Sequence, residues 1–213
     1  MTIIIGLTGF AGSGKDTVAA RLVEQFGAAR VAFADQLKDE IVEAFGVDRQ
    51  LFEDPALKDR PTPELQLRYC TEAGYCDHQW GVANAYGHRP LVDLDEINPR
   101  TIMTTWGDWR RDSDPAYFVR AGLERINALA ASGAHTVAVP DVRYHNERHA
   151  LKGRGAAIWR VSRPGLQPRG GHSSEWALAG TPVDANIVNG GSVEQLDKIV
   201  ADLYLALRDR KAA

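Results

Sequence analysis

IIIGLTGFAGSGKDTVAARLV, residues 3–23, joins three patterns that belong together in one kind of fold. Three β-branched apolar residues in a row, Ile3–Ile5, are typical of a strand that is buried on both faces. Ala19, Leu22 and Val23 recur at the spacing of a helix with one apolar face. A glycine-rich segment lies between these two patterns. The stretch therefore predicts a buried strand, a turn and a helix, in that order.

The glycines of this turn predict a binding site for phosphate groups. Gly9, Gly12 and Gly14 let the backbone wrap with its N–H groups pointing inward, and the following helix adds its positive end. Lys15 follows Gly14 at the Walker A spacing and can carry a positive charge to the β- and γ-phosphates of a nucleotide. A turn that binds nothing is the less favoured interpretation. The predicted nucleotide-binding residues are Gly9, Gly12, Ser13, Gly14, Lys15, Asp16 and Thr17.

The position after the lysine departs from the Walker A pattern. That pattern places a serine or threonine hydroxyl there to bind Mg²⁺, whereas this chain has Asp16, with Thr17 one residue later. Asp141, at the end of a predicted buried strand, lies where Walker B acids are found. We expect the Mg²⁺ ligands to come from Asp16, Thr17 and Asp141, and Asp141 is the leading candidate.

Composition and charge limit the classes of function. The 213 residues are 44% hydrophobic and 25% charged, which suits one compact domain over residues 1–213. A net charge of −3 gives no basic field, so we expect small phosphorylated ligands rather than a nucleic-acid polymer. The sequence has no leader pattern and no apolar run that could span a bilayer, which predicts no membrane partner and a cytoplasmic location. Cys70 and Cys76 match no common zinc pattern and are expected to be reduced thiols.

The rest of the chain alternates strand and helix patterns. After a short strand at 29–33, Asp35 is expected to cap a helix that Gly46 closes. Residues 47–98 are irregular and predict helical pieces and loops, either as one wall of the site or as a structural excursion. Further helices are predicted from Pro99, over 115–131, from Tyr144 and after a capping box at Ser192 and Gln195, and further strands over 136–140, 156–161 and 185–189. Five buried strands with intervening helices predict an α/β fold with a parallel sheet covered on both faces.

Acidic residues at strand ends are candidates for substrate binding. Asp35 follows the second strand, and its position is compatible equally with a substrate contact and with a bare helix cap. Arg143 follows Asp141 by two residues. For this pair, a surface ion pair is the alternative to a functional role.

Arginines gather in two places where they would meet phosphate groups. The loop over 162–174 is rich in glycine and carries Arg163 and Arg169, a composition typical of a lid that closes over a transferring phosphoryl group. A mobile loop without a role is the alternative. The helix from Pro99 carries arginines that either clamp a second phosphate or are merely solvated, namely Arg100, Arg110 and Arg111.

These motifs together resemble the bacteriophage deoxynucleoside monophosphate kinases, a family of P-loop kinases. Their order and spacing match that family over nearly the whole chain, and the Gly-Lys-Asp variant of Walker A is similar to the family's own form. The residues that carry the resemblance are Ser13-Gly14-Lys15-Asp16-Thr17, Phe33-Ala34-Asp35 with Leu37-Lys38, Arg100 with Trp106-Gly107, Asp141-Val142-Arg143 with Asn146-Glu147, and His172-x-Ser174-Glu175.

The resemblance implies transfer of the γ-phosphoryl group of ATP to a deoxynucleoside monophosphate, with Mg²⁺ as the metal, in the supply of phage DNA precursors. It implies a P-loop NTPase-type fold, in which we expect an acceptor-binding insertion at 47–114 and a lid at 163–175. The catalytic residues would be Lys15, Asp141, Arg143, Arg163 and Arg169. The acceptor would be bound by residues among Asp35, Lys38, Arg100, Trp106, Arg110, Arg111, Asp141, Arg143, Glu147 and Glu175.

Two other functions share part of this pattern. Another P-loop small-molecule kinase, of the dephospho-coenzyme A or deoxynucleoside type, would differ only in its acceptor pocket. A nucleotide-binding switch is disfavoured because the chain contains no Asn-Lys-x-Asp and no Asp-x-x-Gly sequence. The sequence leaves open which base is accepted and whether the chain forms a homodimer. If the chain is phage-encoded, we expect it to act in the host cytoplasm.

Overall fold

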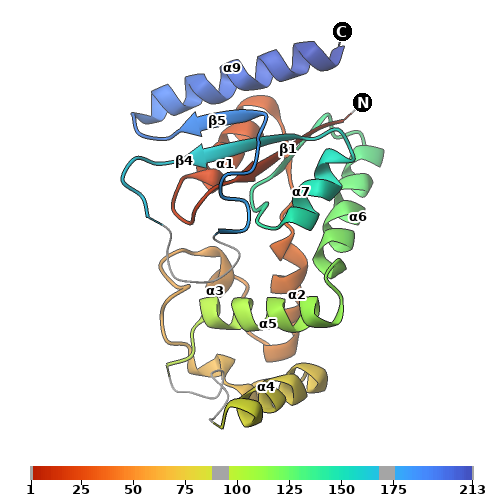
Figure 1. Ribbon diagram of the computed structural model, residues 1–213, viewed down its shortest axis with the longest axis vertical. Helices are drawn as coiled ribbons and strands as arrows, with labels where there is room; N and C mark the ends of the chain where they lie inside the picture. The colour runs from red at the N-terminus through yellow and green to blue at the C-terminus, as the bar shows by residue number, and fades with distance from the viewer. Residues whose placement is uncertain (1, 88–95, 168–175, 213) are drawn as a thin grey trace. The chain divides into compact units, whose positions relative to one another are not determined.

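The computed structural model describes residues 2–87, 96–167 and 176–212 (Figure 1). The chain forms two compact units. The first unit comprises Met1–Phe33 and Val119–Ala213, and the second comprises Ala34–Phe118. The insertion predicted at 47–114 therefore falls within the second unit, which also includes the helix that precedes it.

A five-stranded sheet forms the centre of the first unit, and all of its strands are parallel. The strand order is β2-β3-β1-β4-β5. Ile5 of the central strand pairs with Ala138 on one side and with Ala157 on the other. The predicted α/β class with a five-stranded parallel sheet is confirmed. The strands are β1 (Ile3–Thr8), β2 (Ala29–Arg30), β3 (Thr136–Val139), β4 (Ala157–Ser162) and β5 (Ala185–Val188).

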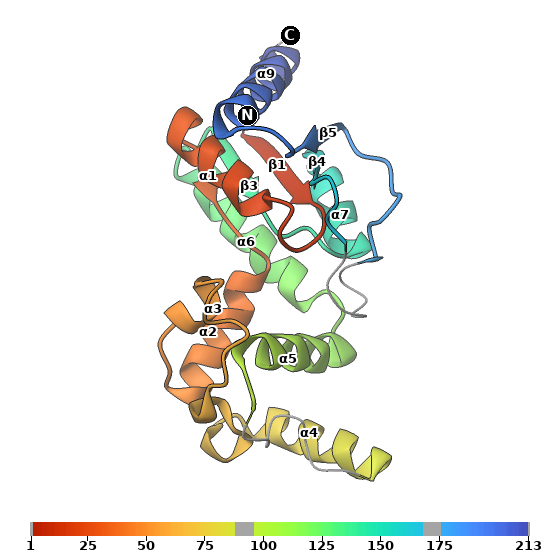
Figure 2. The same cartoon turned by 90° about the vertical axis from the view of Figure 1, so that its left-hand side faces the viewer.

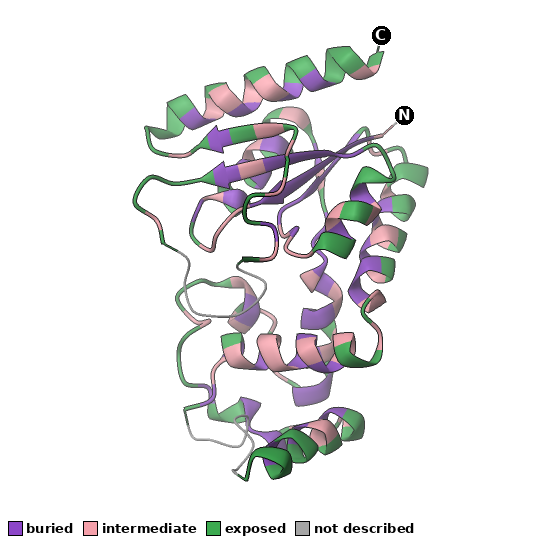
Figure 3. Ribbon diagram, viewed as in Figure 1, coloured by how far each residue is buried: buried purple, intermediate pink, exposed green. Residues whose placement is uncertain are grey.

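Alternating side chains of the strands supply a separate core on each face of the sheet. Ile3, Ile5 and Leu7 pack with α1 (Lys15–Phe26) and α9 (Val193–Ala212). Ile4 points the other way, into a core shared with α6 (Tyr117–Ala131) and α7 (His145–Lys152). The period of two places successive residues of a strand on opposite faces. The predicted helices on both faces are thus confirmed, and Figures 2 and 3 show the helices and the buried strands.

The second unit is helical and has its own hydrophobic core. Trp106, Tyr75 and Phe52 are the largest of its fully buried side chains. The prediction of helical pieces and loops for 47–98 is confirmed in the described residues. The elements are α2 (Ala34–Phe45), α3 (Gln50–Glu53), two 3₁₀ turns at Pro63–Leu65 and Leu67–Tyr69, α4 (Ala73–Tyr86) and α5 (Pro99–Ser113).

The chain between β2 and α2 differs from the prediction in two ways. The strand expected over 29–33 ends at Arg30, and the helix begins at Ala34, so Asp35 lies inside the first helical turn and is not the N-cap. The physical reason lies at Phe33. Its amide donates to the carboxylate of Asp141 at 3.0 Å instead of to a neighbouring strand. The capping box predicted at Ser192 and Gln195 is confirmed by both of its hydrogen bonds.

None of the helices in the described ranges has both the length and the apolar character needed to cross a membrane.

Two glycines in helix interiors are expected to respond to alanine in opposite ways. A Cβ on Gly122 of α6 would lie 2.5 Å from the ring of Phe33, which is buried. A Cβ on Gly81 of α4 would meet nothing within 4 Å. We expect Gly122→Ala to destabilise the protein by about 1–3 kcal/mol through overpacking. We expect Gly81→Ala to stabilise it by about 0.5–1 kcal/mol, because alanine restricts the unfolded chain. Thermal unfolding measures both, and shifts of the same sign would contradict the packing of α6 on Phe33.

Candidate functional site

The loop between β1 and α1 has a backbone that only glycine accommodates well. Gly9, Gly12 and Gly14 have φ values of +140°, +80° and +102°. Close neighbours add a second constraint. A Cβ on Gly9 would lie 2.1 Å from the carbonyl oxygen of Val161, and a Cβ on Gly14 would lie 2.3 Å from Nδ2 of Asn189. Both glycines are therefore required by packing against the ends of β4 and β5 as well as by their dihedral angles.

Several amides of this loop have no hydrogen-bond partner in the part of the chain that the structure describes. The Ser13 amide closes the turn on the carbonyl of Phe10 at 3.1 Å, and the Val18 amide donates to Gly14 at 2.9 Å as α1 begins. No hydrogen bond between described residues uses the amides of Gly12, Gly14, Asp16 or Thr17. Four unpaired donors at the positive end of a 12-residue helix form a site suited to phosphate oxygens.

Lys15 places its charge on the same loop. The side chain is 7% exposed, and its ammonium donates to the carbonyl oxygens of Gly9 at 2.7 Å and Phe10 at 2.8 Å. Both acceptors are backbone carbonyls of the loop, and they fix the position of the ammonium there. The predicted nucleotide-binding residues are thus brought together in one loop.

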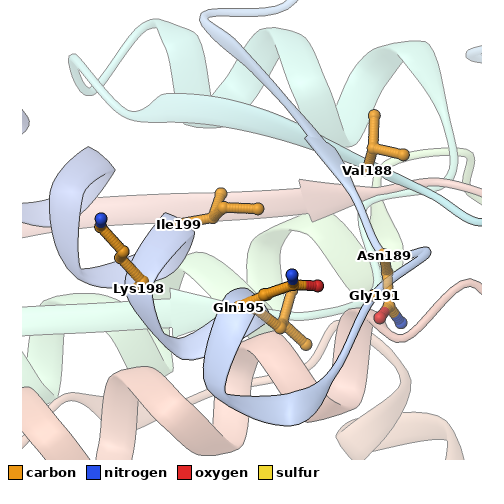
Figure 4. Close-up of a pocket in the computed structure, with 7 residues that line it drawn as sticks. Val188, Asn189, Gly191, Gln195, Lys198 and Ile199 are labelled. Carbon is orange, nitrogen blue, oxygen red and sulfur yellow. The ribbon is translucent and has the colours of Figure 1, made fainter.

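Asn189 is a residue of this site that the sequence reasoning missed. It follows β5, and its side-chain amide donates to the carbonyl of Ser13 at 2.9 Å, while its backbone amide donates to Ser162 at 2.7 Å. It also lines a hollow of about 270 Å³ with Gly191, Gln195 and neighbouring residues (Figure 4). A polar residue at the carboxyl end of a parallel strand was the available signal, since the same argument singled out Asp35 and Asp141.

Ser13 keeps a buried polar atom unsatisfied beside this contact. The residue is 1% exposed, and its hydroxyl oxygen has no hydrogen-bond partner among the described residues. Buried hydroxyls are nearly always paired, so an orphan of this kind in a glycine-rich loop is consistent with a site that is completed by a bound group.

The predicted metal ligands are hard oxygen donors. Asp16 and Thr17 are both exposed at the start of α1, and the Asp16 carboxylate lies 3.9 Å from the guanidinium of Arg30. Asp141 uses one carboxylate oxygen to accept from the Phe33 amide. The described residues contain no cluster of three or more His, Cys, Asp or Glu side chains. This chemistry fits Mg²⁺, which is commonly held by one or two carboxylates together with substrate phosphates and water.

Arg143 and Glu147 belong to the turn that follows Asp141. Glu147 is 3% exposed, and its carboxylate accepts from the amides of Arg143 at 2.7 Å and Tyr144 at 3.0 Å. These bonds shape the entry into α7 and commit at least one Glu147 oxygen to the backbone. The half-buried Arg143 side chain is carried by the turn that this carboxylate holds.

The predicted acceptor residues of the second unit are engaged in several separate contacts. Asp35 accepts from Arg49 at 3.3 Å, and buried Lys38 donates to Glu53 at 2.9 Å. Arg100 forms a two-pronged pair with Asp59. Arg111 lies over the ring of Phe118, and Trp106 and Arg110 both donate to Glu40. Of these residues, Trp106 and Arg110 are therefore brought onto one shared partner.

Some predicted residues fall outside the part of the chain that the structure describes. Arg169 and Glu175 belong to this group, as does most of the predicted lid. Arg163 is described and exposed.

The cysteines carry free thiols as expected, and burial raises the pKa of the Cys70 thiol to about 12, which leaves it protonated and unreactive at neutral pH.

The fold and the loop define the class of protein. A parallel sheet whose first strand runs into a glycine-rich loop of unpaired amides, a buried lysine and a helix N-terminus is a P-loop NTPase-type fold. Comparison with family models gave no match. Comparison with curated proteins and with solved structures gave several matches.

Two viral proteins match nearly the whole chain. The "Putative deoxynucleotide monophosphate kinase" of Acanthamoeba polyphaga mimivirus is 28% identical over 91% of this chain and 91% of its own length. The deoxynucleotide monophosphate kinase of Enterobacteria phage T4 is 26% identical over 91% of this chain and 95% of its own length. These relatives confirm the resemblance to the bacteriophage deoxynucleoside monophosphate kinase family.

Solved structures match at lower similarity. A sugar kinase from Janibacter sp. HTCC2649 is 18% identical with a TM-score of 0.44, covering 97% of this chain and 96% of its own. The protein TT1252 from Thermus thermophilus is 20% identical with a TM-score of 0.46, covering 97% of this chain and 98% of its own. At this similarity neither structure carries an argument about function.

The contact between Asn189 and Ser13 predicts a change in nucleotide affinity. Asn189→Ala removes one hydrogen bond that holds the loop, and we expect the Kd for a non-hydrolysable ATP analogue to rise about three- to tenfold. Asn186→Ala, at an exposed position of β5, is the matched control and should leave the Kd unchanged. Isothermal titration measures both values. Equal affinities for the Asn189 variant and the wild type would show that the contact does not shape the loop.

Proposed function

We propose that the chain is a deoxynucleoside monophosphate kinase that transfers the γ-phosphoryl group of ATP to a deoxynucleoside monophosphate. The observation that carries the proposal is the β1–α1 loop, where four unpaired amides and the Lys15 ammonium gather at one helix N-terminus. The names of the two viral relatives support the acceptor class. The proposed role is the supply of phage DNA precursors in the host cytoplasm.

The proposed reaction exchanges one phosphorus–oxygen bond for another. A phosphate oxygen of the acceptor attacks the γ-phosphorus, and the bond from that phosphorus to the β,γ-bridging oxygen breaks. The electron pair leaves with ADP, and the products are ADP and the deoxynucleoside diphosphate. Such a transfer needs little covalent help from the protein and much positioning and charge stabilisation. Cations and oriented donors are therefore the groups to identify.

The donor side of the reaction is assigned to the loop. Its amides would hold the phosphates of ATP, and Lys15 would neutralise charge on the β- and γ-phosphates. Asp16, Thr17 and Asp141 would hold Mg²⁺, which would supply stabilisation of the negative charge that develops on the phosphates. Arg143 and Arg163 are proposed to face the transferring group. Arg169 keeps the same proposed role, although it lies outside the described residues.

The acceptor side draws on the remaining charged and aromatic residues. Asp35 or Asp141 is proposed near the sugar or phosphate of the monophosphate. The arginines are proposed to bind its phosphate, because a guanidinium can donate two parallel hydrogen bonds to one phosphate. The full proposed set is Asp35, Lys38, Arg100, Trp106, Arg110, Arg111, Asp141, Arg143, Glu147 and Glu175.

A coupled assay of ADP formation tests the proposed function directly. The purified chain is given ATP, Mg²⁺ and, one at a time, the four deoxynucleoside monophosphates, the matching ribonucleotides, deoxynucleosides and dephospho-coenzyme A. We expect ADP formation with at least one deoxynucleoside monophosphate. ADP formation only with a deoxynucleoside or with dephospho-coenzyme A would replace the proposal by the neighbouring class of kinase. ATP binding without turnover on any acceptor would also contradict it.

Lys15→Ala is expected to abolish most of the phosphoryl transfer. The ammonium donates hydrogen bonds to carbonyls of its own loop, so we expect the cores to remain intact, while charge stabilisation of the transition state is lost. We expect kcat/KM to fall by at least about a hundredfold. Lys211→Ala, which removes an exposed lysine contact near the end of α9, is the control. A folded Lys15 variant, checked by circular dichroism, that keeps a tenth of the wild-type kcat would remove Lys15 from this role.

Asp141→Asn and Arg143→Ala are expected to have different kinetic signatures. Asparagine retains an oxygen that accepts from the Phe33 amide, so Asp141→Asn should keep the local structure and raise the Mg²⁺ concentration needed for half-maximal rate. Arg143→Ala should mainly raise KM for the monophosphate. Initial rates over a grid of Mg²⁺ and acceptor concentrations separate the two effects. Identical small losses at saturation would support the surface ion pair instead.

A further inference from the structure

Glu40 of α2 is the hub of a polar network within the second unit. One carboxylate oxygen accepts from the indole Nε1 of Trp106 and from Nε of Arg110, both at 2.9 Å. The other accepts from Gln36 at 3.0 Å and from the Tyr117 hydroxyl. The side chain is only 11% exposed. Four donors from α2, α5 and the start of α6 therefore converge on one nearly buried carboxylate, to which the sequence assigned no role.

The network keeps Glu40 charged. Burial alone would raise the pKa of this carboxyl, but the hydrogen bonds from Tyr117, Trp106, Gln36 and Arg110 outweigh burial and lower the pKa. The carboxylate is therefore ionised at neutral pH, and its lone pairs are committed to fixed donors. A charge held in this way orients its partners more firmly than an exposed ion pair does.

Arg110 is the partner whose position this network sets. Its Nε is bound to Glu40, and its guanidinium carbon lies 4.1 Å from the ring centre of Trp109 and 5.0 Å from that of Tyr117. Its two terminal nitrogens make no hydrogen bond to any residue that the structure describes, and the side chain is 27% exposed. The guanidinium is thus held along one edge and against two rings, while its end-on pair of donors is accessible.

Three described arginines of the second unit, Arg49, Arg68 and Arg100, lack this combination. Arg100 is engaged by both oxygens of Asp59, and Arg49 is shared among Asp35, Asp39 and Glu53. Arg68 lies over the ring of Tyr69 but is exposed and has no carboxylate partner in the described chain. Among these side chains, only Arg110 is both fixed by a carboxylate and accessible at its terminal nitrogens.

We propose that Arg110 is the residue that binds the phosphate of the acceptor monophosphate, and that Glu40 is the positioning residue that orients it. The inference rests on the proposed function for the identity of the ligand. A phosphate monoester presents two oxygens at the spacing of the two terminal nitrogens, so it can take both donors at once. Preorganisation by Glu40 and the two rings removes the entropy that a free arginine would lose on binding.

The experiment compares each deoxynucleoside monophosphate with its own deoxynucleoside, so that only the phosphate differs. Isothermal titration of the full chain without ATP gives Kd for both ligands. We expect wild type to bind one monophosphate at least about tenfold more tightly than its nucleoside. Arg110→Ala should raise the Kd for the monophosphate by at least about tenfold and leave the Kd for the nucleoside unchanged. Arg110→Lys should lose most of the same advantage, because an ammonium cannot reproduce the planar fork.

Arg68→Ala is the matched control, because it removes an arginine that also lies over an aromatic ring of the second unit. It should leave both affinities unchanged. Binding of a non-hydrolysable ATP analogue is measured on every variant and should not change with Arg110. If wild type shows no preference for the monophosphate, the proposed acceptor class is wrong. If wild type shows the preference and Arg110→Ala retains it, this inference alone is wrong.

Glu40→Gln separates positioning from simple charge compensation. If Glu40 orients Arg110, the loss of the carboxylate charge should weaken monophosphate binding by about three- to tenfold. If Glu40 only lowers the local positive potential, the same variant should bind the monophosphate more tightly, which would overturn the positioning role. Should Glu40→Gln fail to fold, Tyr117→Phe keeps the ring beside Arg110 and removes one donor to Glu40. Tyr117→Phe should weaken binding of the monophosphate and leave binding of the nucleoside unchanged. Unchanged binding of the monophosphate would overturn the positioning role of Glu40.

Discussion

The left-handed backbone of the β1–α1 loop is the constraint on which the donor site depends. Gly9 and Gly14 could not carry a side chain, because a carbonyl of β4 and the amide of Asn189 occupy the space. In this conformation the loop presents four amides that no hydrogen bond between described residues uses. Unpaired amides cost about 1–3 kcal/mol each when buried, but Gly12, Asp16 and Thr17 are exposed, so their amides are accessible to water and, in the proposed function, to phosphate.

The second unit contains a nearly buried charge, the carboxylate of Glu40. Desolvation makes such a carboxylate costly unless every lone pair is matched, and the four donors supply that match. Removing one partner of a buried network leaves the rest unsatisfied, whereas an exposed pair such as Arg100 with Asp59 contributes little. The helices that carry these donors are thereby tied to one another by polar bonds as well as by the core around Trp106.

Local patterns in the sequence predicted most of the first unit. The run of β-branched residues at Ile3–Ile5, the glycine turn and the capping box at Ser192 depend on neighbours within a few residues, and all are found in the structure. The predictions were wrong or incomplete where residues distant in the sequence determine the local structure. The Asp141 carboxylate takes the Phe33 amide across 108 residues, which ends the strand early and moves Asp35 into the helix. Asn189 meets Ser13 across 176 residues, a contact that no local spacing reveals.

The same distinction explains why the two phosphate sites differ in how visible they are in the sequence. The β1–α1 site is made of backbone, so its requirement is for glycines and a lysine at fixed spacing, and that requirement forms a short pattern. The Arg110 site is made of side chains from three segments that meet on Glu40. An arginine on a helix is uninformative until the carboxylate that orients it is known. In this chain the network around Glu40, and not a sequence motif, is therefore what singles out Arg110 for the proposed role.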